Sequence, residues 1–428
     1  MQFLYRDDKD FQARLGQMLS REPFSPEIEA AAATIIDEVR RRGDEALCDF
    51  AEKFDHARLA PSQFRLGDEE VDEACKSVSP EDREAIDMAV AHIQEFYSHT
   101  LPEDWSYSPR PGVVLGEQFH PLDIVGCYIP GGTAPLVSTV CHTAAIARTA
   151  GVKDIVVCTP PGGTKGIHPA LLYACRAAGA TAIYRLGGVY AIAAMAIGTA
   201  TIPKVEKICG PGNAYVAAAK RRLYGEVALD LVAGPSEVLV IADDTANPVY
   251  LAADILSQAE HGSGREQAVL VSTDRRILDE AAREIVRQAA LLKRQECVQK
   301  VLENGLFLVE AADLEDAARI ASLYAPEHLE LQVADPKALA PKITAAGAIF
   351  MGEYTPEPVG DYIAGPSHVL PTGGTARFFN GLTGDAFFRR TSLLSYDREA
   401  LLREQPALAR LTAAEGLDAH GRSAAIRK

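Results

Sequence analysis

Side chains that can bind metal ions or transfer protons concentrate in four short segments of this sequence. These are residues 258–262, 325–330, 360–362 and 415–420, which together hold three of the ten histidines. In every segment a histidine or carboxylate stands close to glycine or proline. Imidazole nitrogens and carboxylate oxygens are common zinc ligands, and histidine titrates near neutral pH. The pattern indicates one assembled site for metal binding and proton transfer.

The first segment offers a possible pair of metal ligands. Gln258 and His261 lie three residues apart near the end of an expected helix, so both project from one face. Imidazole and an amide oxygen can both serve in a zinc site. The alternative is an ordinary polar helix end, at which His261 interacts with the helix dipole.

The second segment offers two proton-handling groups. Glu327 and His328 follow Pro326, which predicts a fixed turn. Neighbouring side chains in an extended stretch point apart, so the two groups could serve separate steps of one reaction, with His328 as a general base. A surface Glu–His pair without function is the alternative.

The remaining segments lie late in the chain. Asp361 precedes a stretch rich in turn-forming residues, 364–375, and such loops often carry function. Glu415 and His420 follow an expected helix, 395–414, close to the C-terminus. They could reach a distant site by packing back against the chain or by crossing to another subunit.

The elements that must position these residues alternate between strand and helix. Short apolar runs bounded by glycine turns predict buried strands at 124–129, 154–158, 182–186, 207–209, 237–242, 268–272, 306–309 and 348–351. Alanine-rich or amphipathic stretches predict helices at 26–55, 81–98, 143–150, 168–178, 189–199, 247–260, 275–292 and 312–323. This alternation predicts two parallel α/β units.

Three glycine-rich turns follow predicted strands, at 130–133, 187–190 and 210–213. A glycine turn that leads into a helix N-terminus can bind a pyrophosphate. None of the three fits the G-x-G-x-x-G fingerprint of dinucleotide-binding proteins. Nucleotide binding and simple tight turns therefore both remain open from spacing alone.

Composition excludes several classes of protein. The formal net charge of −16 disfavours a nucleic-acid partner, because a phosphate backbone needs an excess of Lys and Arg. No run of about 18 apolar residues predicts a membrane span, and the first residues lack a signal-peptide pattern, so we expect a cytoplasmic protein. The eight cysteines form no C-x-x-C pair, and we expect buried reduced thiols; a cysteine-based zinc or redox site is the alternative.

Taken together, these segments resemble the histidinol dehydrogenase family. The similarity extends from about Glu27 to the C-terminus. The motifs that carry it are 126–132, 210–216, 233–238, 258–262, 325–330, 360–375 and 415–420. Several long motifs in the same order are far more specific than any one of them. The resemblance implies a zinc- and NAD-dependent, four-electron oxidation of L-histidinol to L-histidine through an aldehyde-level intermediate.

The resemblance also implies roles for individual residues, which fall into four sets. The zinc ligands would be Gln258, His261, Asp361 and His420, with one Zn²⁺ per subunit and His420 supplied by the partner in a homodimer. The acid–base residues would be Glu327 and His328. Ser236, His368 and Glu415 would contact the substrate, together with His328 and the four zinc ligands. Tyr128 and Asn213 would contact NAD⁺.

The fold that the resemblance implies consists of two incomplete, doubly wound Rossmann-like units in an intertwined homodimer. We expect a helical N-terminal segment at 1–24 and a first unit made of 25–127 and 236–381, carrying most zinc and catalytic residues. A nucleotide-binding second unit would span 128–235, and 382–428 would form a dimerisation segment.

Two departures from the family pattern concern the cofactor region. Tyr190 stands where relatives usually have glutamine in a G-G-A-Q-A turn, and it could stack on or hydrogen-bond the nucleotide. His142 stands where apolar residues are common, as a tolerated neighbour of the cofactor or as a substrate contact.

Two other functions compete with histidinol oxidation. A relative with the same fold could oxidise another small alcohol, such as a sulfonated propanediol, although Glu415 favours a cationic amine. A zinc-binding scaffold without catalytic activity is less favoured, because both the Glu327–His328 pair and the 210–213 turn are intact.

Overall fold

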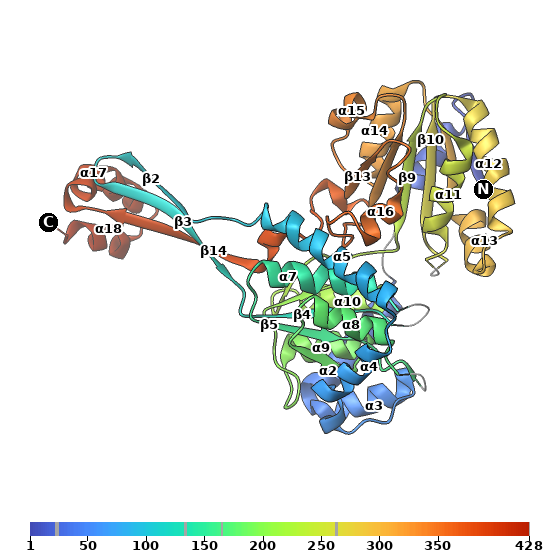
Figure 1. Ribbon diagram of the computed structural model, residues 1–428. Coiled ribbons are helices and arrows are strands. Elements are labelled where there is room, and N and C mark those ends of the chain that lie inside the picture. Colours follow the sequence, from blue (N-terminus) through green and yellow to red (C-terminus); the bar gives the residue numbers. More distant parts are fainter. Residues whose placement is uncertain (22–24, 132–134, 164–165, 262–263, 428) are drawn as a thin grey trace.

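Two parallel β-sheets, each covered by helices on both faces, make up most of the computed structural model (Figure 1). The structure describes residues 1–21, 25–131, 135–163, 166–261 and 264–427. Gly132 and Thr133 of the first glycine turn, and Gly262 after the first ligand pair, lie outside these ranges. Within the described ranges, no helix is both long and apolar enough to cross a membrane.

The five-stranded sheet has the order β6–β5–β4–β7–β8, with every pair parallel. Its strands are β4 (Ile124–Tyr128), β5 (Asp154–Cys158), β6 (Ala182–Tyr184), β7 (Lys207–Cys209) and β8 (Ala228–Leu229). Its helices are α2 (Pro26–Arg42), α3 (Asp44–Asp55), α4 (Asp68–Lys76), α5 (Pro80–Ser98), α6 (Val137–Val140), α7 (Ile146–Thr149), α8 (Pro169–Ala177), α9 (Gly188–Ile197) and α10 (Ala214–Leu223). Apolar strand residues are buried on both faces, as expected for a parallel sheet between helices.

The helices between residues 26 and 98 belong to this five-stranded unit. Ile36 of α2 and Ile93 of α5 pack in the two hydrophobic clusters on its opposite faces. The expected grouping of 25–127 with 236–381 is therefore wrong, and its boundary also cuts through β4. Helix periodicity shows which face is buried, but it does not show which sheet buries that face.

The six-stranded sheet has the order β1–β11–β10–β9–β12–β13, again with every pair parallel. Its strands are β1 (Gln2–Leu4), β9 (Glu237–Ala242), β10 (Gln267–Ser272), β11 (Leu306–Glu310), β12 (His328–Gln332) and β13 (Ala348–Met351). Its helices are α1 (Phe11–Leu19), α11 (Pro248–Ala259), α12 (Arg275–Ala289), α13 (Gln295–Asn304), α14 (Leu314–Tyr324), α15 (Pro336–Leu339) and α16 (Glu357–Tyr362). Alternate residues of β9 enter different clusters, so helices cover both faces.

Two stretches that we expected to be purely helical differ in the structure. The N-terminal segment contains the edge strand β1, which pairs with β11, in addition to α1. The stretch 26–55 is divided into α2 and α3 at Gly43, whose φ of 57° ends the first helix. Glycine adopts such a conformation readily because it has no Cβ.

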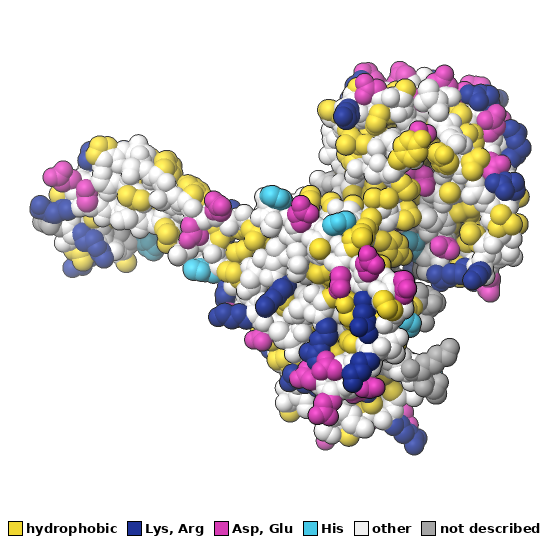
Figure 2. All heavy atoms as spheres, in the orientation of Figure 1, with side chains coloured by type: hydrophobic (Ala, Val, Ile, Leu, Met, Phe, Trp, Pro, Cys, Tyr) yellow, Lys and Arg dark blue, Asp and Glu magenta, His cyan; other side chains and the backbone are white. Residues whose placement is uncertain are grey.

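A slender arm carries the C-terminus away from both units (Figures 1 and 2). It consists of an antiparallel sheet, β14 (Phe388–Tyr396), β3 (Val113–Pro121) and β2 (Trp105–Arg110), with α17 (Arg398–Ala414) and α18 (Asp418–Ala425). The arm thus contains more than the expected terminal segment 382–428, because β3 pairs with β14 and β2 pairs with β3. Long-range pairing of this kind leaves no local signature in the sequence.

Candidate active site

A pocket of about 490 Å³ lies between the two units. Pro130 and Pro211 line it from the loops that follow β4 and β7, at the carboxyl ends of the five-stranded sheet. Ser236 and His328 line it at the amino ends of β9 and β12 in the six-stranded sheet. The pocket therefore joins opposite strand ends of two different sheets.

Potential metal ligands meet at one side of this pocket. His261, Glu357 and Asp361 each offer a ligand atom, and these atoms lie within 4.8 Å of one another. Gln258 joins them, since its side-chain amide lies 3.4 Å from Nδ1 of His261. The Oε1 atom of Gln258, Oε1 of Glu357 and Oδ1 of Asp361 are buried and have no hydrogen-bond partner in the described part of the chain.

These orphaned oxygens fit a bound cation. Buried polar atoms without partners are costly, and a metal ion would satisfy several at once. Imidazole with carboxylate and amide oxygens suits zinc. The donor set lies on α11, on the residues just after it and on α16, which sits at the edge of its unit that faces the other unit (Figure 1).

Glu327 and His328 lie together beside this donor set. Both are buried, and Oε2 of Glu327 is 3.8 Å from Nδ1 of His328. The main chain of Glu237 contacts both: its N–H donates to Oε2 of Glu327 at 2.9 Å, and its oxygen lies 3.1 Å from Nδ1 of His328. The side chains are therefore closer than we expected for neighbours in an extended stretch, and they are not a surface pair.

The surroundings of this pair shift both pKa values upward. Burial raises the pKa of Glu327 to about 8, against the opposing effect of His328. Burial alone would lower the pKa of His328, but the carboxylates of Glu327, Glu357 and Asp361 raise it well above its usual value. Both groups can therefore hold a proton at neutral pH, as general acid–base residues must.

His368 and Ser236 also line the pocket. Nδ1 of His368 lies 3.1 Å from the main-chain oxygen of Asp361, and its ring stacks on His142 with centroids 4.4 Å apart. Both ring nitrogens of His142 are buried without hydrogen-bond partners among the described residues. Burial lowers the pKa of His142 and of His368, which favours the neutral form of both rings. His142 thus contacts His368, the candidate substrate contact on the pocket wall.

Of the three candidate nucleotide contacts, Asn213 lines the pocket, whereas Tyr190 and Tyr128 are buried. Asn213 lines the pocket and caps α10, accepting hydrogen bonds from the N–H groups of Tyr215 and Val216. Tyr190 is 1% exposed, and its hydroxyl donates to Asp55. Its expected stacking on a nucleotide is therefore wrong, because ring and hydroxyl are enclosed in the core. Tyr128 is also buried and accepts a hydrogen bond from the N–H of Gly188.

Glu415 and His420 do not join the other site residues within this chain. Both are exposed on the arm, at the end of α17 and in α18. Figure 1 shows this end of the arm far from α16 and β9. The chain by itself assembles every other residue of the expected zinc and acid–base sets.

Sequence reasoning missed two carboxylates at this site. Glu357 precedes Asp361 by four residues, a spacing that places both on one face of α16 and could have revealed it. Glu237 begins a strand whose other residues are apolar, and a charged residue in such a buried strand could have indicated a functional position.

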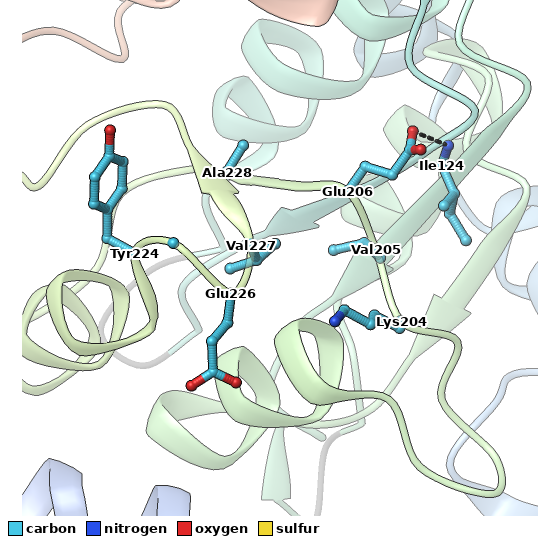
Figure 3. A pocket seen from close by; sticks show the side chains of 9 residues that line it. Ile124, Lys204, Val205, Glu206, Tyr224, Glu226, Val227 and Ala228 are labelled. Carbon is cyan, nitrogen blue, oxygen red and sulfur yellow. Dashed lines mark hydrogen bonds between the residues drawn. The ribbon is translucent and has the colours of Figure 1, made fainter. Parts of the chain in front are cut away.

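A second, shallow depression lies elsewhere on the five-stranded unit (Figure 3). It sits where β4, β7 and β8 begin, whereas open α/β sheets bind ligands at the carboxyl ends of strands. Its acidic side chains are also engaged, since Glu226 pairs with Arg40 and Glu206 with Arg389. We assign no function to this depression.

The fold and the site define an α/β protein with a buried carboxylate–imidazole centre between two parallel sheets. A model of the histidinol dehydrogenase family matches residues 20–428. The chain is 43% identical over 430 residues to histidinol dehydrogenase of Geobacter metallireducens, covering 100% of this chain and 98% of that protein. It is 46% identical over 399 residues to the Gloeobacter violaceus enzyme, covering 93% and 89%.

A solved structure agrees with these sequence relatives. Histidinol dehydrogenase from Elizabethkingia anophelis superposes with a TM-score of 0.94 at 36% identity, covering 100% of this chain and 98% of that one. The chain belongs to the histidinol dehydrogenase family.

Proposed function

We propose that this protein oxidises L-histidinol to L-histidine in a zinc- and NAD-dependent, four-electron reaction. Family membership supports the substrate. The observation that carries the chemistry is the juxtaposition of an unsatisfied donor set with the Glu327–His328 pair in one pocket. Each turnover would reduce two NAD⁺, first at the alcohol and then at the hydrated aldehyde.

Gln258, His261 and Asp361 would hold the zinc ion together with His420 of the partner subunit. When bound, zinc supplies a Lewis-acid centre for the imidazole and amino nitrogens of histidinol, which fixes the substrate's orientation. Glu357 lies within reach of the same ion. Ser236 and His368, on the pocket wall, would contact the substrate.

Glu327 and His328 would transfer the protons of the reaction. In its neutral form, His328 would remove the proton of the substrate hydroxyl through Nε2, which has no hydrogen-bond partner in the described chain. Glu327 would then activate the water that adds to the aldehyde, and its raised pKa of about 8 suits a group that gains and loses a proton near neutrality. His328 would act as base again for the second oxidation.

The nucleotide would bind at the carboxyl ends of β4 and β7. NAD⁺ supplies the hydride acceptor when it is bound. The strand order of the five-stranded sheet is third, second, first, fourth and fifth, and β9–β13 repeat this order in the six-stranded sheet, to which β1 adds an edge strand. This order supports a Rossmann-like arrangement and a ligand at the reversal point. Asn213 is the nucleotide contact that its pocket position supports; Tyr190 is withdrawn from this role.

We also infer a homodimer in which the arm reaches the partner's pocket. All of β2 and most of β14 are exposed, and Tyr107, Leu394 and Leu411 are 53%, 73% and 67% exposed. Apolar side chains on a projecting arm favour burial against another chain. The exchange would bring Glu415 to the substrate's amino group and His420 to the metal.

The test is NADH formation by the zinc-loaded protein with L-histidinol, compared with dihydroxypropanesulfonate. We expect two NADH per histidinol consumed and no turnover of the sulfonate. Turnover of the sulfonate alone would replace the proposed substrate, and one NADH per histidinol would remove the four-electron assignment.

A further inference from the structure

The main chain of Glu237 lies between the two acid–base residues. Its N–H donates to Glu327 and its oxygen faces Nδ1 of His328, at 2.9 and 3.1 Å. A carbonyl oxygen can only accept, so this contact requires the proton of a neutral His328 to reside on Nδ1. Nε2 is then left with its lone pair, in the form that a base needs. One peptide segment thus orients Glu327 and selects the tautomer of His328.

The side chain of Glu237 holds the same peptide in place through contacts with Arg21 and Gly373. Its Oε1 atom accepts from Nη1 of Arg21 at 2.5 Å and from the N–H of Gly373 at 3.0 Å. The side chains of Arg21 and Glu237 are only 9% and 4% exposed. The anchor therefore joins the end of the N-terminal segment, the start of β9 and the loop after α16.

Arg21 is itself held by a rigid neighbour. Its guanidinium lies 3.9 Å above the ring of Tyr324 and donates to the main-chain oxygen of that residue. The hydroxyl of Tyr324 donates to Gln267 at 2.8 Å. Tyr324 is the last residue of α14, which leads through Ala325 and Pro326 into the Glu327–His328 pair. Arg21 therefore contacts both Tyr324, which shortly precedes the pair in the chain, and Glu237, whose main chain contacts the pair.

A buried ion pair is costly to form, because both charges lose their hydration. A hydrophobic pair could fill the same space, so stability alone does not explain Arg21 and Glu237. Their geometry supplies another reason. The contacts to Glu327 and His328 come from main-chain atoms of Glu237, so they depend on how this peptide is held, and the side chains of Arg21 and Glu237 hold it.

We propose that Arg21 and Glu237 are positioning residues for the acid–base pair, holding the peptide that orients Glu327 and fixes the tautomer of His328. This inference rests on the proposed oxidation for its kinetic consequences. Removal of Arg21 releases the peptide, so Glu327 and the His328 ring lose the main-chain contacts that orient them. The effect falls on the rate of turnover and not on metal or substrate binding.

The kinetic test compares Arg21→Ala, Arg21→Lys and Glu237→Gln in the zinc-loaded protein. We expect kcat to fall on the order of 10- to 100-fold in Arg21→Ala, as for other residues that orient a functional group. KM for L-histidinol and zinc content should stay within about twofold, and added guanidinium should restore part of kcat in Arg21→Ala but not in Glu237→Gln. Arg21→Lys keeps a charge and should be less impaired.

Arg275→Ala is the matched control. Arg275 also ties the N-terminal segment to the six-stranded sheet, through Asp7 at 2.7 Å and Glu310 at 2.8 Å, but it does not touch the pocket. Its removal should leave kcat unchanged. If Arg21→Ala is folded and keeps wild-type kcat, or if it loses activity only in proportion to lost zinc, the proposal is overturned.

A second measurement does not depend on catalysis. The N–H of Glu237 is bonded to Glu327, so its hydrogen exchange reports directly on this peptide. Exchange at 236–238 should be faster in Arg21→Ala than in wild type or Arg275→Ala. Unchanged exchange would reject the positioning role, whereas failure of the wild-type protein to oxidise histidinol would reject only the proposed function.

Discussion

Nε2 of His328 lies 3.4 Å from Oδ1 of Asp361, and neither atom has a hydrogen-bond partner in the described part of the chain. A candidate base thus faces a candidate metal ligand across a short gap. One side chain would move a proton while the other holds an ion. Their roles should therefore be separable by mutation.

His328→Asn should lower kcat by roughly 10²- to 10⁴-fold, the usual contribution of a general base, while leaving zinc content unchanged. Asp361→Asn should reduce zinc content as well as activity, because it removes an anionic ligand. Steady-state kinetics and metal analysis of both variants check this. Loss of zinc from His328→Asn would show that the two roles are not separate.

A site completed across a dimer makes a specific prediction for mixed subunits. His420→Asn and His328→Asn should each be nearly inactive alone. When the two are unfolded together and refolded, half of the dimers are mixed and each mixed dimer has one intact site. Activity should then return to about a quarter of wild type.

The control for this experiment is a mixture of His328→Asn with Glu327→Gln. Both changes fall in the same pocket of one chain, so no mixed dimer contains an intact site and activity should stay low. A site completed within one chain would give no recovery in either mixture, which would sink the proposed exchange of arms.

Tyr190→Phe should lower stability without weakening cofactor use. The change leaves the half-buried Asp55 without its hydroxyl donor, at a cost of about 1–3 kcal/mol in the free energy of unfolding. Urea denaturation measures that cost. The KM for NAD⁺ should not change, and a large increase would restore Tyr190 as a nucleotide contact.

The raised pKa of Asp55 should make the free energy of unfolding depend on pH. Burial raises the pKa of Asp55, although the hydrogen bond from Tyr190 opposes the shift. The folded state then binds more protons than the unfolded state, so the free energy of unfolding falls as pH rises between the unfolded and folded pKa values. Asp55→Asn removes the titrating carboxyl group, so this fall in the free energy of unfolding should disappear.

Denaturation of wild type and Asp55→Asn at about pH 4 and about pH 8 measures the difference. The variant should gain stability relative to wild type at the higher pH. A difference that is the same at both values would contradict the raised pKa.

Most strands and helices, and the types of residue that form the candidate site, can be predicted from short stretches of the sequence. Strands such as 154–158 and 237–242 are recognisable because apolar runs between glycine turns are a local property, and the structure has them at these positions. Residue type and spacing make Gln258, His261, Asp361, Glu327 and His328 candidates, the resemblance to the family implies their roles, and the structure brings these five together. Residue types and local secondary structure depend on residues that are close together in the sequence.

The contacts between residues far apart in the chain could not be predicted and depend on tertiary packing. It assigned the helices of 26–98 to the five-stranded sheet and enclosed Tyr190 with Asp55, 135 residues away. It also set the peptide of Glu237 against Glu327 and His328, ninety or more residues later, and left His420 on an arm remote from its expected ligand set. Such contacts depend on how whole elements pack, and periodicity and spacing describe only one element at a time.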